Sequence, residues 1–351
     1  MANMASPIRE GTKSAAVFSS RDIDILKEKL SVTINKDFSE ADYIAEYQIY
    51  SEKEGKQIPL LFFAMNYKGD FRVFVDENET SLLEIPPDFT VESDSMFNGF
   101  SNEFNTSVDN SERKVVKIQF EKNSKREYPI TDLKYFEVDL TKGEHRIRVE
   151  YTANVWKDRS GWVNKYRFPY SLSPARNWRS FGEIEIVLNS REFGKNLSTN
   201  IGQPSSGNMN SIATWDFNKL PDADVFDVSY TPEINSATKA MIEIDPFGLA
   251  CIAGIILALF HFIFIRNFRI RKPDKKFSWI LVTGSLIIPF LIILCYIFSY
   301  DIIDGMIGND ASKYHGYTFL ALAFYPIILI IYFVIMLIAD IILKKKHLKT
   351  V

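Results

Sequence analysis

Few side chains before residue 245 are of the types that build catalytic centres. His145 is the only histidine in that part of the chain, so a histidine-based metal cage or catalytic triad would depend on it alone. The sequence has no glycine-rich phosphate loop, no His-Glu-x-x-His and no Gly-x-Ser-x-Gly, the patterns that position phosphates, zinc and a nucleophilic serine. We therefore predict no catalytic residue and no cofactor, and we interpret His145 as a partly exposed strand residue.

Two acidic clusters offer oxygen atoms of the kind that bind calcium. They lie at Asp76–Glu79 and at Asp222–Asp227. Neither has the spacing of a recognised calcium-binding loop, and solvated turns account for both. The sequence thus predicts no metal site.

One segment places two arginines beside a tryptophan. Arg176, Trp178 and Arg179 fall between Pro174 and a strand that is expected to start near Glu183. If exposed, this group would form an external binding patch for a carboxylate, a glycan or lipid head groups, because arginine supplies forked donors and tryptophan a flat apolar face. If buried, Trp178 would close one end of the β region while the arginines reach outward. The solvent exposure of Trp178 separates the two interpretations.

A second group shares one face of a predicted helix. Ala250, Gly254 and Ala258 are spaced by four and His261 follows three residues later, which places them on one stripe of an α-helix. Small residues let helices approach closely, and a histidine on the same stripe seeks a polar partner rather than lipid. We predict a helix-packing face that contacts other helices of this chain, a membrane protein partner or a second copy of the chain.

The helix that carries this face is one of three long apolar segments. The predicted transmembrane helices are 247–265, 277–300 and 318–343. About 20 helical residues cross a hydrocarbon core of about 30 Å, so each segment is long enough to span. The lipid bilayer is therefore the first partner that the sequence predicts.

Charges on the connections predict the orientation. The loop 266–276 and the tail 344–351 are rich in lysine and arginine, whereas the short loop 301–317 carries three aspartates and one lysine. Because short basic loops remain cytoplasmic, we expect residues 1–245 outside a plasma membrane and the C-terminus inside. An external N-terminal domain requires an export signal, and residues 1–21 contain no apolar core of one. Either a signal peptide was removed upstream, or the N-terminal domain is cytoplasmic and every loop violates the positive-inside rule. We favour the first interpretation, because the second requires three independent charge signals to be wrong.

Residues 1–245 are expected to form β structure. Apolar and polar residues alternate in many segments, as in Tyr43, Ala45, Tyr47 and Ile49, and turn residues separate these segments. Alternation of this kind is typical of antiparallel sheets with one buried face. We predict an antiparallel β-sandwich, either one large sandwich or two in tandem, with the polar stretch 86–112 as the place for an internal boundary.

The average composition conceals this organisation. The 351 residues are 46% hydrophobic and 24% charged, with a formal net charge of −3, which excludes a disordered chain and gives no basis for binding nucleic acid. We expect a non-enzymatic integral membrane protein whose external β region is a binding or interaction module in a membrane complex, with an unidentified ligand. Two alternatives stay open: a subunit of a transport complex, and a membrane-anchored enzyme that uses carboxylates of the β region.

Overall fold

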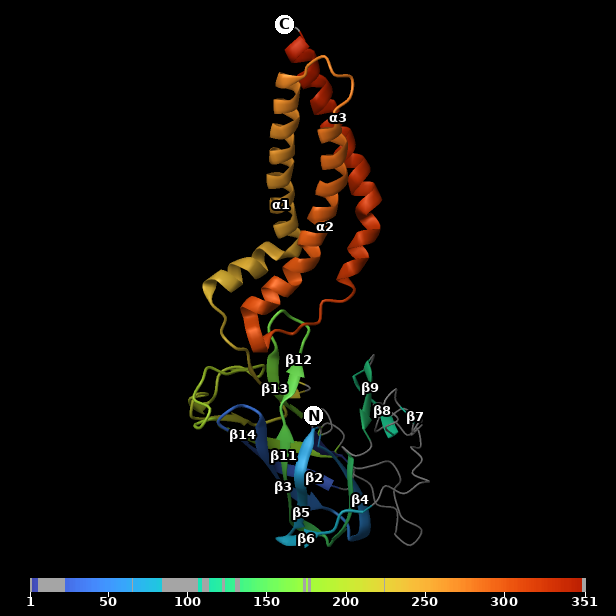
Figure 1. The fold of residues 1–351 in the computed structure, drawn as a ribbon. Helices are drawn as coiled ribbons and strands as arrows, with labels where there is room; N and C mark the ends of the chain where they lie inside the picture. Colours follow the sequence, from blue (N-terminus) through green and yellow to red (C-terminus); the bar gives the residue numbers. More distant parts are fainter. Residues whose placement is uncertain are drawn as a thin grey trace. The chain divides into compact units, whose positions relative to one another are not determined.

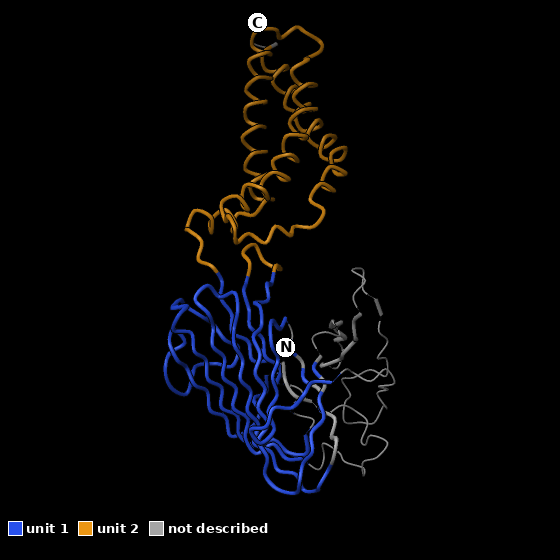
Figure 2. Tube along the Cα trace, turned by 60° about the horizontal axis from the view of Figure 1, so that its bottom comes forward, with its two compact units in different colours: residues 1–158, 165–231 blue, residues 159–164, 232–351 orange. Residues whose placement is uncertain are grey.

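The computed structural model describes residues 2–5, 23–64, 66–83, 107–108, 114–121, 124–129, 133–172, 175, 178–223 and 225–348. The chain divides into two compact units (Figure 2). Unit 1 comprises residues 1–158 and 165–231, and unit 2 comprises residues 159–164 and 232–351. The predicted order, a β-sheet region followed by three long apolar helices, is confirmed (Figure 1).

The largest sheet of unit 1 has eight strands. In spatial order they are β16 (Ser206–Gly207), β17 (Ile212–Phe217), β14 (Ser180–Asn189), β2 (Ile23–Ile34), β3 (Glu40–Ser51), β11 (Gly143–Asn154), β5 (Tyr67–Val75) and β6 (Asn78–Thr80). Every neighbouring pair is antiparallel except β14 and β2, which run parallel. The sheet is therefore mixed, and the prediction of a purely antiparallel arrangement is wrong at this pair. β2 and β14 are far apart in the chain, so no hairpin turn forces them to be antiparallel.

Three smaller sheets accompany it in the described part of unit 1. One has the order β12 (Trp156–Asp158), β13 (Lys165–Ser171), β18 (Val225–Tyr230) and β15 (Ser198–Thr199). The others are β1 (Ala2–Ala5), β4 (Gly55–Ala64) and β10 (Leu133–Leu140), and β7 (Ser107–Val108), β8 (Lys114–Glu121) and β9 (Ser124–Pro129). Apart from β7, the predicted boundary region 86–112 lies outside the described residues.

Alternating side chains of the large sheet enter one hydrophobic core. In β3, Tyr43, Ala45, Tyr47 and Ile49 are buried, while the residues between them are more exposed. The same core receives side chains from β4 and β10 and from β13 and β18. Three sheets thus share one apolar interior.

Unit 2 contains the three long helices. They are α1 (Ser236–Arg271), α2 (Trp279–Ile307) and α3 (Tyr325–Leu348), and the short 3-10 helices η4 (Gly308–Asp310) and η5 (Thr318–Phe324) lie between α2 and α3. Each long helix carries a segment that is apolar and long enough to cross a bilayer. The helical backbone of α1 extends beyond the predicted segment 247–265 at both ends. α2 begins two residues after the predicted start at 277 and ends seven residues beyond the predicted end at 300.

α1 changes direction at Asp245 (Figure 1). Asp245 has a φ of 60° and a ψ of 169°, and its Oδ1 accepts a hydrogen bond of 2.8 Å from the N–H of Gly248. The hydrogen bond is the one that an N-cap side chain makes, although the positive φ is unusual for an N-cap, and Pro246 follows where a missing N–H costs little. Residues 236–244 are therefore a separate short helix that precedes the apolar segment.

Candidate functional site

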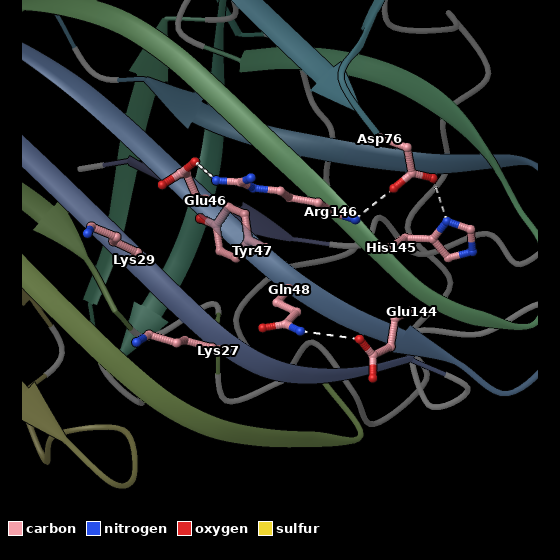
Figure 3. Close-up of a pocket in the computed structure, with 9 residues that line it drawn as sticks. All are labelled: Lys27, Lys29, Glu46, Tyr47, Gln48, Asp76, Glu144, His145 and Arg146. Atoms are coloured by element: carbon pink, nitrogen blue, oxygen red, sulfur yellow. Dashed lines mark hydrogen bonds and ion pairs between the residues drawn. The ribbon is translucent and has the colours of Figure 1, made fainter.

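A charged groove of about 480 Å³ lies over one face of the large sheet in unit 1 (Figure 3). Its side chains come from β2, β3 and β11 and from the turn after β5, and the lining residues are Lys27, Lys29, Glu46, Tyr47, Gln48, Asp76, Glu144, His145 and Arg146. We call this surface the charged groove. Because one face of the three strands packs on the core, the charged side chains that alternate with the core residues line this surface.

Opposite charges are paired along the charged groove. The ammonium groups of Lys27 and Lys29 each lie 3.0 Å from a carboxylate oxygen of Glu185 on β14. Arg146 forms an ion pair with Glu46, and the amide of Gln48 donates a hydrogen bond of 3.3 Å to Glu144 (Figure 3). The surface therefore presents both signs of charge at close spacing.

His145 and Asp76 form a hydrogen-bonded pair in the charged groove. His145 Nδ1 lies 2.7 Å from Asp76 Oδ2, and the backbone N–H of Arg146 donates to Asp76 Oδ1 at 2.8 Å (Figure 3). Partial burial raises the pKa of Asp76, but these two donors outweigh it and hold the pKa below its usual value. His145 lies at the start of β11 and is half-buried, with Nε2 2.9 Å from the carbonyl oxygen of Thr141.

The acidic side chains that line the charged groove are all held by hydrogen-bond donors. A general acid needs a carboxyl whose pKa is raised toward neutrality, whereas that of Asp76 is lowered, and Glu46 and Glu144 are already paired with donors. Within the described ranges no group of three or more His, Cys, Asp or Glu side chains is arranged to hold a metal ion. The acidic cluster Asp222–Asp227 is described only in part, because Asp224 lies outside the described residues.

A buried carboxyl group, Glu28, lies in the core. The register of β2 on β3 shifts between Ile25 and Lys27, so that Glu28 faces the core. The hydroxyl of Tyr170 donates to Glu28 Oε1 at 2.7 Å and lies 2.7 Å from the hydroxyl of Tyr47, while Glu28 Oε2 has no hydrogen-bond partner within the described residues. Burial raises the pKa of Glu28 to about 7, although the two tyrosine hydroxyls oppose the shift. The alternation of Leu30, Val32 and Ile34 places residue 28 on the buried face, which is the signal that sequence analysis missed.

The described residues do not form the predicted external binding patch. Trp178 is 7% exposed and belongs to the hydrophobic core of unit 1. Arg179 is partly exposed and lies 2.6 Å from Glu52 and 3.5 Å from Asp24. Arg176 lies outside the described residues. The position of Trp178 corresponds to the buried alternative, in which the ring closes part of the core.

The predicted helix-packing face contacts helices of the same chain. A Cβ atom on Gly254 would lie 3.2 Å from Ile292 of α2, and Ala258 packs against the small hydrophobic cluster between the helices. Ala250 is 5% exposed. His261, which is 3% exposed, donates through Nε2 to the carbonyl oxygen of Ile280 at 3.0 Å. Its Nδ1 accepts from the hydroxyl of Tyr332 in α3, also at 3.0 Å, so the histidine joins all three helices.

A buried ion pair joins α1 to α3. Arg269 donates through Nε to Asp340 Oδ1 at 2.6 Å and through Nη2 to Oδ2 at 2.5 Å, and its Nη1 donates to the carbonyl oxygen of Lys275 at 2.7 Å. The side chains of Arg269 and Asp340 are 2% and 5% exposed. Lys344 lies four residues after Asp340, a spacing that favours a local ion pair, but both oxygens of Asp340 accept hydrogen bonds from Arg269 instead.

Comparison with known proteins gives no family. No family matches the chain and no curated protein matches its sequence. Among solved structures, a putative nutrient binding protein of Legionella pneumophila has a TM-score of 0.37 at 10% identity, covering 60% of this chain and 68% of that chain. An M1 zinc metallopeptidase of Deinococcus radiodurans has a TM-score of 0.30 at 8% identity, covering 61% and 45%. Leukotriene A4 hydrolase of Saccharomyces cerevisiae has a TM-score of 0.34 at 10% identity, covering 60% and 29%. This chain spans less than half of the last two proteins, and similarities of this size say nothing about its function.

Proposed function

We propose that the chain is an integral membrane protein whose unit 1 is a non-enzymatic, extracytoplasmic binding module. The observation that carries the proposal is the charged groove, which is open, has a volume of about 480 Å³ and is lined by side chains of both signs. Such a surface suits a hydrophilic partner of mixed charge, for example the surface of another protein, which exchanges ion pairs with it. Complementary charges of this kind determine which partner binds more than how tightly it binds.

The three helices support an anchoring role. The candidate packing face and the Arg269–Asp340 pair are both used between helices of this chain. Neither is left for contact with a second protein, so we favour an anchor over a subunit that assembles through α1. Carboxylate chemistry in unit 1 has less support, because the acidic side chains of the charged groove are held in pairs.

The same proposal includes a single β-sandwich for unit 1. The support is the one core that receives side chains from the eight-stranded, the four-stranded and the β1–β4–β10 sheets. Residues 1–158 and 165–231 also group into one compact unit, which favours one sandwich over two in tandem.

Orientation in the membrane follows from the connecting charges and is tested by labelling. The end of α1 and the connection to α2 carry five exposed basic residues, Arg266, Arg271, Lys272, Lys275 and Lys276. In a background in which Cys251 and Cys295 are replaced by alanine, Gln203→Cys reports on unit 1 and Asp274→Cys on the basic loop; both positions are exposed. An impermeant thiol reagent added to intact cells should label Gln203→Cys and leave Asp274→Cys unlabelled until the membrane is opened. The reverse pattern would overturn the proposed orientation.

Binding at the charged groove is tested by site-specific cross-linking. A photoreactive amino acid at Gln48, inside the groove, should give a discrete cross-linked species in intact cells, and the same amino acid at the exposed Gln203 should not. The double change Lys27→Glu and Lys29→Glu should abolish the species by reversing the charge beside Glu185. Equal cross-linking from both positions, or a species that persists in the reversed-charge variant, would contradict binding at this groove.

A further inference from the structure

Unit 2 contains a cavity of about 600 Å³ beside the connection between α2 and α3. Its walls are mostly apolar and come from four elements, with Ala250 and Cys251 on α1, Ile292 on α2, Ala321 and Phe324 on η5, and Ile328 on α3. Ligand pockets typically measure about 300–1,000 Å³ and combine apolar walls with a few polar groups. We call this space the bundle cavity.

Polar side chains gather at one end of the bundle cavity. The hydroxyls of Tyr296 and Tyr300 lie 3.0 Å apart, and His315 Nε2 lies 2.9 Å from the carboxylate of Asp304. Trp162 stacks on Tyr300 with ring centres 5.5 Å apart and lies against His315 at 4.5 Å. This end therefore offers phenol, imidazole and aromatic faces, the groups that are enriched where a membrane meets water.

The segment with Trp162 is fixed to the α2–α3 connection by backbone hydrogen bonds. The N–H of Asn164 donates to the carbonyl oxygen of Asp310 at 2.7 Å, and the N–H of Ser312 donates to the backbone carbonyl oxygen of Trp162 at 3.0 Å. An isolated β-bridge joins Val163 to Ala311. The polar end of the bundle cavity is thus pre-organised, which lowers the entropic cost of binding a ligand there.

One wall of the bundle cavity is an unusual helix. η5 is a 3-10 helix of seven residues, whereas runs longer than three or four are uncommon, and none of its residues is buried. Phe319, Leu320 and Phe324 are each more than half exposed. These exposed apolar side chains leave contact area for a hydrocarbon ligand.

We propose that the bundle cavity binds one acyl chain of a phospholipid, with the head group at Tyr300 and His315. The inference rests on the membrane insertion proposed above, because hydrocarbon chains are the apolar ligands present around such helices. Its walls match an acyl chain in polarity, and the phenol and imidazole groups match the oxygen atoms of the ester and phosphate region. The carboxylate of Asp304, which contacts the lining residue His315, disfavours an acidic head group, so we expect a zwitterionic lipid.

Photolabelling of the full chain in mild detergent tests the proposal. The probe is a phosphatidylcholine with a diazirine at the end of one acyl chain, titrated against the protein, and mass spectrometry locates the label. Attachment to Ile292 and Ala321 should saturate near one lipid per protein, whereas attachment to lipid-facing residues such as Ile255 and Ile331 should rise without saturation. Labelling of the cavity walls that never saturates, like that of Ile255, would overturn the proposal.

Matched variants separate the bundle cavity from the lipid-facing surface. Ala321→Phe and Cys251→Phe fill it from two elements, η5 and α1, and displacement of two methylene groups should weaken the saturable labelling about tenfold. Ala323→Phe and Ile252→Phe place the same phenyl ring at exposed positions outside the cavity and should change nothing. The proposal is wrong if all four variants behave alike.

Flotation with phosphatidylcholine vesicles distinguishes the proposal of membrane insertion from that of lipid binding in the cavity. A chain that fails to insert contradicts membrane insertion. An inserted chain without saturable labelling contradicts only lipid binding in the cavity.

Discussion

Gly182 on β14 lies against the carbonyl oxygen of Leu26, the residue at the bulge of β2. A Cβ atom built on Gly182 would be 2.2 Å from that oxygen and 3.1 Å from its carbon. Both contacts are to backbone, so no side chain could move aside. The bulge is the point at which β2 shifts its register and Glu28 comes to face the core. A glycine in one strand thus permits the bulge that buries a carboxyl group in the next.

Gly182→Ala should destabilise the protein by about 1–3 kcal/mol, because the added methyl group forces two paired strands apart. Chemical unfolding of the purified chain, followed by tryptophan fluorescence, measures the effect, since Trp178 and Trp215 lie in the same core. Gly161→Ala is the control, since the nearest atom to its Cβ would be 3.8 Å away. Equal unfolding free energies for the two variants would show that the strands separate without cost.

Glu28 should make the protein less stable as the pH rises from about 4.5 to about 7. Its pKa in the folded state is about 7, so in this range the folded chain holds a proton that the unfolded chain has released. The free energy of unfolding then falls with rising pH, by about 3 kcal/mol between pH 4.5 and pH 7. Above about pH 7, Glu28 contributes no further change in the free energy of unfolding. Unfolding curves at several pH values measure the slope.

Glu28→Gln should remove this component of the slope. The amide keeps an acceptor for Tyr170 but places an NH₂ group where Glu28 Oε2 has no described partner, which costs about 1–3 kcal/mol at every pH. The stability of the variant relative to the natural chain should therefore improve as the pH rises. The exposed change Glu54→Gln serves as the control. Parallel curves for Glu28→Gln and the natural chain would show that the Glu28 carboxyl does not titrate in this window.

The strands and helices could be predicted because each repeats a short-range pattern. Burial alternates along β3 at Tyr43, Ala45, Tyr47 and Ile49, as the sequence indicates. The parallel pairing of β14 with β2 could not be predicted, because it depends on which distant strands meet rather than on either strand alone. The alternating apolar residues run from Ile34 back to Leu30. The next position on the same face is Glu28, and a carboxylate there suggests that the strand has ended. For this reason the sequence did not indicate Glu28 as a core residue.

Whether a candidate site could be predicted also depended on how far apart its residues lie along the chain. The stripe of Ala250, Gly254, Ala258 and His261 could be identified from spacing within one helix, but its partners on α2 and α3 could not. The partner of Asp340 lies 71 residues away at Arg269, while spacing alone suggests Lys344. The charged groove is built from β2, β3 and β11, and no segment of the sequence shows it by itself.

Arg269→Ala should destabilise the helical unit by about 3–5 kcal/mol, because it leaves the carboxylate of Asp340 buried without a partner. Thermal unfolding in detergent, followed by circular dichroism, measures the loss. Arg271→Ala removes an exposed arginine from the same helix and should have little effect. The double change Arg269→Met and Asp340→Leu should recover most of the stability, because it removes both buried charges and keeps apolar volume. If the double variant is no more stable than Arg269→Ala, the loss is one of packing rather than of charge.

Gly284→Ala should destabilise the bundle through His261. A Cβ atom at position 284 would lie 2.2 Å from His261 Nε2, and the ring is held by hydrogen bonds to Ile280 and Tyr332. Displacing the ring leaves these buried groups without partners, at a cost of about 1–3 kcal/mol. Gly305→Ala, in the same helix with no atom within 4 Å of its Cβ, should instead stabilise the protein by about 0.5–1 kcal/mol, as alanine does in a helix interior.

The cause is tested by adding His261→Ala to each glycine variant. If the clash with the imidazole is responsible, Gly284→Ala should carry no penalty in the absence of the ring, and the two changes should be strongly non-additive in the free energy of unfolding. Gly305→Ala and His261→Ala have no contact through the added methyl group and should be additive. If the effects of Gly284→Ala and His261→Ala are additive, the alanine at position 284 acts on the backbone of α2 rather than on the imidazole. The close approach of α1 to α2 would then not depend on the glycine that contacts His261.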